Sequence, residues 1–348
     1  MQRAPTGKED VLLHMKNFKL AAGILLLTAA VFTSCKDAQD GPGISSVQYA
    51  PDSADAKVQT TVSESPTPAA SPSEAKGSRD AAPRVLLPTS PGTEEYGNEV
   101  ASIDASNSAE GYVTARYFGS NSKVKLMITG PDANTYRYDL NTKEYTAFPL
   151  TAGNGTYSIG IYENISGDSY TTAMKIDISV TLNDEFRPYL YPSQYVDFDE
   201  NCLIVEKAQE LALPADNDLD VVSNIYNYVI KNISYDHDKA AAPPTGYISS
   251  VDDTLESGKG ICLDYAAVMT GMLRSQGIPT RLEVGYAKEA YHAWISTYIK
   301  DIGWINGMIE FDGKTWKLMD PTFAANSSEK SLKKFIGNGS NYTVKYEY

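Results

Sequence analysis

Three residues in the carboxyl-terminal half of the chain could together form an activated thiol: Cys262, His292 and Asp320. They occur in this order, at intervals of about thirty residues. A thiol becomes a strong nucleophile when it loses its proton, an imidazole can accept that proton, and a carboxylate can orient the imidazole. If the fold brings the three side chains together, the chemistry that they predict is acyl transfer through a thioester.

Cys262 lies between a glycine pair and a segment with helical spacing. Gly258 and Gly260 precede it, and the apolar-periodic segment that follows stops at Gly277 and Pro279. We therefore predict an amphipathic helix that begins at Cys262 and faces the core. The unpaired N–H groups of a helix start favour an anion, so we expect a lowered thiol pKa, and the glycines should allow a substrate to approach the backbone. A buried structural cysteine would fit the helix start equally well.

The other two residues lie on predicted strands. Alternating apolar residues predict strands at 280–286, 292–298 and 315–320. A period of two puts His292 and Trp294 on one face, and the proline after Asp320 keeps that residue extended at its strand end. A sheet packed on the Cys262 helix could present His292 to the thiol and Asp320 to the other imidazole nitrogen. A histidine beside a tryptophan is also common as a packed core residue.

Several short motifs in the same order resemble the transglutaminase-like superfamily. They are Gly258-x-Gly-x-Cys262-x-Asp-Tyr-Ala266, Leu273-Arg-Ser-Gln-Gly-Ile-Pro279, Gly285-Tyr286, His292-Ala-Trp294 and Asp320-Pro-Thr322, all within residues 219–326. The resemblance implies a papain-like core in which the cysteine helix packs on an antiparallel sheet. It implies Cys262 as nucleophile, His292 as general base and acid, and Asp320 as the residue that orients His292.

The same resemblance implies an oxyanion donor upstream of the cysteine. Tyr235 is our candidate, because a phenol can donate to a tetrahedral oxyanion, although simple packing explains it equally well. Among the nearby polar residues, His237 is expected on the surface and Asp264 in local hydrogen bonds at the helix start. Cys202 lacks a base and is expected as a small buried side chain; a Cys202–Cys262 disulfide is the alternative for both thiols.

The amino terminus predicts export. A basic segment and a short apolar run (20–32) end at Cys35 in a pattern that resembles a bacterial lipobox, so residues 1–34 are expected to be a lipoprotein signal peptide, with Met15 as a candidate start. Cys35 would carry the lipid anchor of an extracytoplasmic protein on the bacterial cell membrane. The arrangement resembles bacterial lipoproteins that carry a transglutaminase-like domain.

The rest of the chain divides by composition. Residues 35–95 are poor in large apolar side chains and predict a disordered tether. Short alternating strands within 96–184 predict a small immunoglobulin-like β-sandwich, whose many tyrosines are expected to pack and not to bind carbohydrate. An aromatic and proline-rich connector (185–215) is expected to dock between this sandwich and the transglutaminase-like domain at 216–348. The expected fold class is therefore α+β.

The net charge of -14 argues against nucleic acid as a partner, and no cofactor or metal is expected. The function that we predict is thiol acyl transfer on peptide or carboxamide bonds, with a protein or peptide substrate, cell-wall peptide among the candidates. Whether water or an amine accepts the acyl group stays open. The alternative is a non-catalytic module that binds cell wall or protein at the cell surface.

Overall fold

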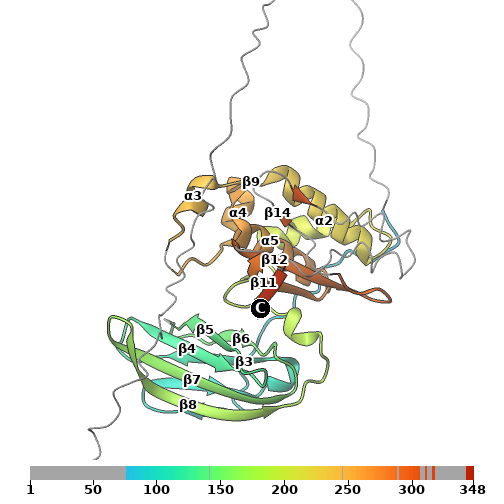
Figure 1. The fold of residues 1–348 in the computed structure, drawn as a ribbon. Coiled ribbons are helices and arrows are strands. Elements are labelled where there is room, and N and C mark those ends of the chain that lie inside the picture. The colour runs from blue at the N-terminus through green and yellow to red at the C-terminus, as the bar shows by residue number, and fades with distance from the viewer. Residues whose placement is uncertain are drawn as a thin grey trace, which may run out of the picture.

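The structure, a computed structural model, describes residues 76–140, 142–244, 246–287, 290–305, 310–311, 316–317 and 342–348. These residues combine helices with antiparallel sheets, as predicted. In Figure 1 the strands of residues 95–180 lie together in the lower half, and the helices pack over β11 and β12 in the upper half. In the described residues no helix is long and apolar enough to cross a membrane.

Two four-stranded antiparallel sheets form the amino-terminal half. One has the order β1-β2-β3-β6, with β1 at Glu95–Gly97, β2 at Ala101–Asp104, β3 at Tyr112–Tyr117 and β6 at Thr146–Pro149. The other has the order β5-β4-β7-β8, with β5 at Thr135–Asp139, β4 at Val124–Thr129, β7 at Gly155–Ser166 and β8 at Ser169–Val180. Residues from both sheets belong to one hydrophobic cluster, so their inner faces share a core. Two short 3-10 helices, Ser108–Glu110 and Arg187–Tyr189, complete this region.

Several tyrosines of this region pack as expected, whereas Tyr96 is exposed. Tyr136, Tyr138 and Tyr157 are buried, and the Tyr138 ring lies against Phe148 with ring centroids 4.9 Å apart. Burial of a ring removes its face from solvent and from any sugar. The structural interpretation of these tyrosines is therefore confirmed.

Helix α5 (Cys262–Ser275) is the centre of the carboxyl-terminal half. It packs against α1 (Leu203–Ala212), α2 (Asp218–Asn232) and α4 (Val251–Ser257), and against strands β11 (Thr280–Ala287) and β12 (Ala290–Ile299). Every residue from Leu263 to Ser275 is buried. The prediction of an amphipathic helix is therefore wrong: α5 has neighbours all around it, which leaves no solvent face.

One sheet of four strands covers α5. Its order is β13-β12-β11-β16, with β13 at Gly303–Ile305 and β16 at Tyr342–Glu347, and all its pairs are antiparallel. β16 lies at one edge of this sheet. Smaller pairs are formed by β9 (Ser234–Tyr235) with β10 (Lys259–Gly260) and by β14 (Glu310–Phe311) with β15 (Trp316–Lys317). A short helix, α3 (His237–Ala241), follows β9.

The expected connector contains a helix that the sequence analysis missed. In α1 the buried residues Ile204, Val205, Ala208 and Ala212 have helical spacing. The prolines and aromatic residues just before them made the whole segment read as a connector. The connector docks between the two halves, because the Tyr195 ring lies 5.9 Å from Tyr138 of β5 and 4.3 Å from Tyr348, between ring centroids.

The prediction of a tether to residue 95 is wrong for its last part. Arg79 forms an ion pair with Asp218 at 2.7 Å, and the Arg84 N–H donates to the Ser275 carbonyl at 2.6 Å. Further along, the Gly92 N–H donates to Asp104 at 2.7 Å. Residues 76–94 thus run across both halves, held by polar contacts that a composition poor in apolar residues does not predict. Residues 1–75, with the signal peptide and Cys35, lie outside the described residues.

Candidate active site

The thiol of Cys262 lies at the start of α5, as predicted. Cys262 is the first helical residue and is half-buried, and Ile261 before it has the extended backbone of an N-cap. The N–H groups of Cys262 and Leu263 face the sulfur, and so does the N–H of Ala293 on β12. Donors from the helix start and from the sheet therefore meet at this one atom.

The expected low pKa of this thiol is a wrong prediction. Burial raises the pKa of the Cys262 thiol to about 11, and the charge of nearby Asp264 acts in the same direction. The three backbone N–H groups oppose this shift, because they stabilise the thiolate, but they do not reverse it. Cys262 taken alone is therefore a protonated thiol at neutral pH, and its use as a nucleophile requires a base.

His292 is placed on the strand that contacts the thiol. It lies on β12 directly before Ala293, whose N–H faces the Cys262 sulfur, and opposite Gly285 of β11. Its half-buried ring stacks on Trp294, with centroids 6.4 Å apart and planes at 26°. Tyr291, the residue before His292, lies near enough to the Cys262 sulfur for the charge of a thiolate there to raise the pKa of its phenol. The structure thus brings Cys262 together with the segment that carries His292; Asp320 lies outside the described residues.

Tyr235 also lies beside the helix start. In the parallel pair of β9 and β10 it is the partner of Gly260, two residues before Cys262. Its half-buried ring stacks on Tyr265 at 6.4 Å and meets the edge of His237 at 5.2 Å, between ring centroids. This position suits a donor near the thiol. His237 itself is exposed, as predicted.

The two glycines before Cys262 serve the fold and not the approach of a substrate. Gly258 ends α4 with a φ of 61°, in the left-handed region that favours glycine. Gly260 is buried, and a Cβ there would lie 2.6 Å from the Cβ of Asp264. The space beside Gly260 is thus filled by the next turn of the chain, which corrects the interpretation from sequence.

Comparison with known proteins assigns this region to a family. Residues 205–307 match the model of the Transglutaminase-like superfamily. These residues are a transglutaminase-like domain. The match includes α5 with Cys262, and β11 and β12 with His292.

Individual relatives are distant. The chain is 28% identical over 221 residues to the UPF0252 protein MJ1282 of Methanocaldococcus jannaschii, a match that spans 56% of this chain and 60% of that protein. Among solved structures, a "putative cysteine protease" from Cytophaga hutchinsonii is 16% identical with a TM-score of 0.34, over 72% of both chains. A "putative protease" from Parabacteroides distasonis is 13% identical with a TM-score of 0.26, over 59% of this chain and 62% of that one.

In the part of the chain that the structure describes, the two cysteines are separate thiols. Neither Cys202 nor Cys262 forms a disulfide bond, so the predicted alternative of a bridge between them is wrong. Cys202 is half-buried in front of α1, and its sulfur accepts the N–H of Asp199 at 3.4 Å. Burial raises the pKa of this thiol too, and Cys202 serves below as an internal reference.

Asp264 has partners that the sequence did not predict. Its fully buried carboxylate accepts the N–H of Ile261 at 2.8 Å, which is the expected local bond at the helix start. It also accepts the Lys239 ammonium at 2.8 Å and the Tyr247 hydroxyl at 2.6 Å. Lys239 and Tyr247 lie 25 and 17 residues earlier in the chain, a separation at which spacing gives no signal.

Proposed function

We propose that this protein is a cysteine-dependent acyl-transfer enzyme with Cys262 as its nucleophile. The observation that carries the proposal is the packing of α5 on β12, which brings the Ala293 N–H near enough to favour the Cys262 thiolate. It joins the start of α5 to the residue after His292, inside a transglutaminase-like domain. A thiol next to an imidazole is the arrangement from which thioester chemistry starts.

In the proposed mechanism His292 acts as general base and then as general acid. It removes the proton of Cys262 while the sulfur attacks the carbonyl carbon of a peptide or carboxamide. Collapse of the tetrahedral intermediate breaks the carbon–nitrogen bond, and His292 returns the proton to the leaving amine. The thioester that remains is opened by water, which gives an acid, or by an amine, which gives a new amide. The high thiol pKa makes the base necessary.

Two further groups complete the proposed site. The N–H of Cys262 at the open helix start is a donor for the oxyanion, with Tyr235 as the second candidate. Asp320 is proposed to accept from the other nitrogen of His292 and so to fix the orientation of the ring. Each of these roles is open to a single substitution: Tyr235→Phe should leave alkylation of the thiol intact and slow only the reaction with an amide.

We also propose a setting for the enzyme. The lipobox-like sequence around Cys35 supports a lipoprotein on the bacterial cell surface, and the two antiparallel sheets at 95–180 support an immunoglobulin-like sandwich beside the catalytic domain. A protein or peptide substrate, cell-wall peptide included, fits a thiol acyl-transfer site in this location.

The proposal predicts how alkylation of Cys262 depends on pH. With His292 as base, the rate with iodoacetamide should reach a plateau well below the thiol pKa of about 11, because the neutral imidazole takes the proton. In His292→Ala the rate at pH 7.5 should fall by at least about tenfold and should rise only towards the thiol pKa of about 11. Mass spectrometry of peptides from one digest reports Cys262 and Cys202 together, so Cys202 is a reference in each sample.

Two outcomes would contradict the proposed site. One is a wild-type profile that His292→Ala leaves unchanged while the variant stays folded by circular dichroism. The other is equal and slow alkylation of Cys262 and Cys202 at every pH, which would favour the non-catalytic binding module.

The acceptor of the acyl group can be determined with a glutamine peptide and a tagged amine. We expect ammonia release without incorporation of the tag, because water is by far the most abundant acceptor in solution, and no release by Cys262→Ala. Incorporation of the tag at a rate similar to ammonia release would assign a transamidase instead.

A further inference from the structure

The carboxylate of Asp264 sits two residues after the proposed nucleophile and is completely buried. Its Oδ2 atom accepts the Ile261 N–H and the Lys239 ammonium, both at 2.8 Å, and its Oδ1 atom accepts the Tyr247 hydroxyl at 2.6 Å. The first of these bonds satisfies an N–H group that the start of α5 would otherwise leave open. Asp264 therefore fixes the backbone immediately before Cys262.

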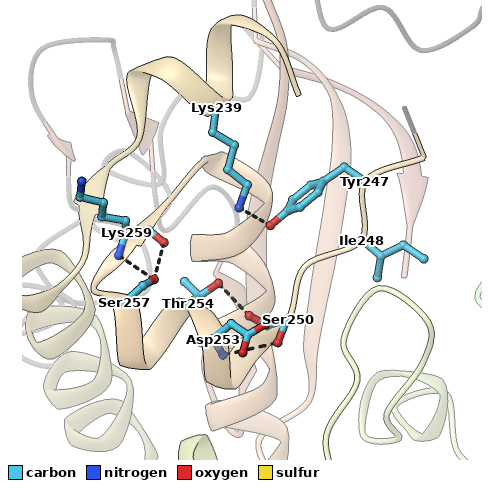
Figure 2. Close-up of a pocket in the computed structure, with 8 residues that line it drawn as sticks. All are labelled: Lys239, Tyr247, Ile248, Ser250, Asp253, Thr254, Ser257 and Lys259. Atoms are coloured by element: carbon cyan, nitrogen blue, oxygen red, sulfur yellow. Dashed lines mark hydrogen bonds between the residues drawn. The ribbon is translucent and has the colours of Figure 1, made fainter. Parts of the chain in front are cut away.

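A buried carboxylate is stable only with partners that balance its charge. Lys239 supplies the opposite charge from α3, with a side chain that is 26% exposed. Its ammonium also hydrogen-bonds the hydroxyl of Tyr247, in the loop before α4, so the three polar groups close a triangle. Figure 2 shows the Lys239 side chain reaching toward the Tyr247 hydroxyl.

The charge of Asp264 acts on the thiol as well as on the helix. It raises the pKa of Cys262, because a neighbouring negative charge disfavours a thiolate. Among the described residues, Tyr291 of β12 also lies near the sulfur, and His292 follows it on the same strand. The Lys239 ammonium contacts the Asp264 carboxylate, and its effect on the sulfur is to offset the charge of that carboxylate. A positive charge held against that carboxylate reduces its field at Cys262.

We propose that Lys239 and Tyr247 are positioning residues for the thiol: they hold and neutralise the Asp264 carboxylate, which fixes the helix start that carries Cys262. The proposal rests on the proposed function for its biological meaning. The effect of Lys239 on the ionisation of Cys262 can be measured without a substrate. It assigns to α3 and the loop before α4, which supply no member of the proposed triad, a part in setting the reactivity of the nucleophile.

The chain offers a matched control for Lys239. Lys259 lines the same pocket of about 290 Å³ as Lys239 and Tyr247, and it is only three residues from Cys262 in sequence. Its ammonium points away from Lys239 in Figure 2. Removal of either lysine changes the net charge equally, so a difference between the two variants reports the contact with Asp264 and not general electrostatics.

The test measures the pH profile of Cys262 alkylation in the full chain. In Lys239→Met we expect the rate at pH 8 to fall about tenfold, which corresponds to a rise of about one unit in the thiol pKa. Lys239→Arg should stay within about twofold of wild type, and so should Lys259→Met, because both variants keep a cation against the Asp264 carboxylate. Tyr247→Phe removes one hydrogen bond without a charge and should fall between wild type and Lys239→Met.

A double variant separates charge from folding. In Lys239→Met with Asp264→Asn neither charge remains, so the profile should return towards wild type even if the single lysine variant unfolds. A folded Lys239→Met with the wild-type profile would overturn the proposal, and so would a double variant as slow as a folded single variant. Failure of the proposed function has a different signature, namely a Cys262 profile that is independent of His292 and still shifts in Lys239→Met.

Discussion

Replacing Arg274 with alanine is expected to lower the free energy of unfolding by about 3–5 kcal/mol, because it removes charged donors from three buried backbone oxygens and opens a cavity. The guanidinium of Arg274 is completely buried in α5. It donates to the carbonyl oxygen of Tyr191 at 2.6 Å, to that of Thr280 at 3.0 and 2.8 Å, and to that of Tyr348 at 2.7 Å. One side chain thus joins the connector, the start of β11 and the residue after β16 to the central helix.

The sign of this effect follows from two opposing contributions. Burial of the cation is costly and lowers the pKa of Arg274 to about 9, so its removal returns some free energy. Against this, the carbonyl groups of three separate segments lose charge-assisted bonds, which contribute about twice as much as neutral ones. The loss outweighs the return, since the site is sealed and alanine brings neither a donor nor volume.

Urea unfolding of the full chain measures this prediction. Arg137→Ala is the control, because Arg137 is an exposed arginine of β5 with one long bond of 3.4 Å to a backbone carbonyl, and its loss should cost less than about 0.5 kcal/mol. A change below about 1 kcal/mol in Arg274→Ala would mean that the carbonyl groups find other donors, and that Arg274 does not bind the segments together.

The elements that the sequence predicted are those whose signals are local. Asn217 precedes α2 and accepts the N–H of Asp220 at 3.1 Å, which is the local signal of a helix N-cap. β11 and β12 follow the alternation of their sequences. In the four-residue β2, by contrast, Ser102 and Asp104 are as buried as Ala101 and Ile103, so the polar residues of its alternating sequence do not mark an exposed face.

The candidate site divides in the same way. The types and order of Cys262 and His292 were readable from the chain, and so was the helix start. The depth of Cys262 in the fold was not, and this depth decides its pKa: the N–H groups at the helix start favour the thiolate, but burial outweighs them. The order of the motifs indicated a nucleophile, whereas only the packing shows that its thiol needs a base.

A second buried acid, Glu283 of β11, gives the largest expected dependence of stability on pH. It is only 4% exposed, accepts the Ser296 hydroxyl at 2.7 Å and accepts a hydrogen bond from the Trp294 side chain. Burial raises its pKa from 4.5 to about 7, the charge of Glu347 adds to this, and Arg281 opposes it. Trp294 stacks on His292, so Glu283 also supports the ring that lies against the proposed base.

The direction of the pH effect follows from this raised pKa. Below pH 4.5 the carboxyl is protonated in the folded and the unfolded chain, and its ionisation costs no stability. Between 4.5 and about 7 the unfolded chain loses the proton first, so stability falls as pH rises and then stays level above about 7. The shift of about 2.5 units amounts to about 3 kcal/mol at pH 8.

Glu283→Gln should remove this dependence and keep the contacts, because its amide oxygen can still accept from Ser296 and Trp294. We expect the variant to match wild type at pH 4.5 and to exceed it by up to about 3 kcal/mol at pH 8, in urea unfolding at the two pH values. Glu256→Gln, at an exposed position of α4, is the matched loss of charge and should change stability by less than about 0.5 kcal/mol at both. A difference between Glu283→Gln and wild type that stays the same at pH 4.5 and 8 would show that the carboxyl does not titrate in the fold, and that its role beside Trp294 is only that of an acceptor.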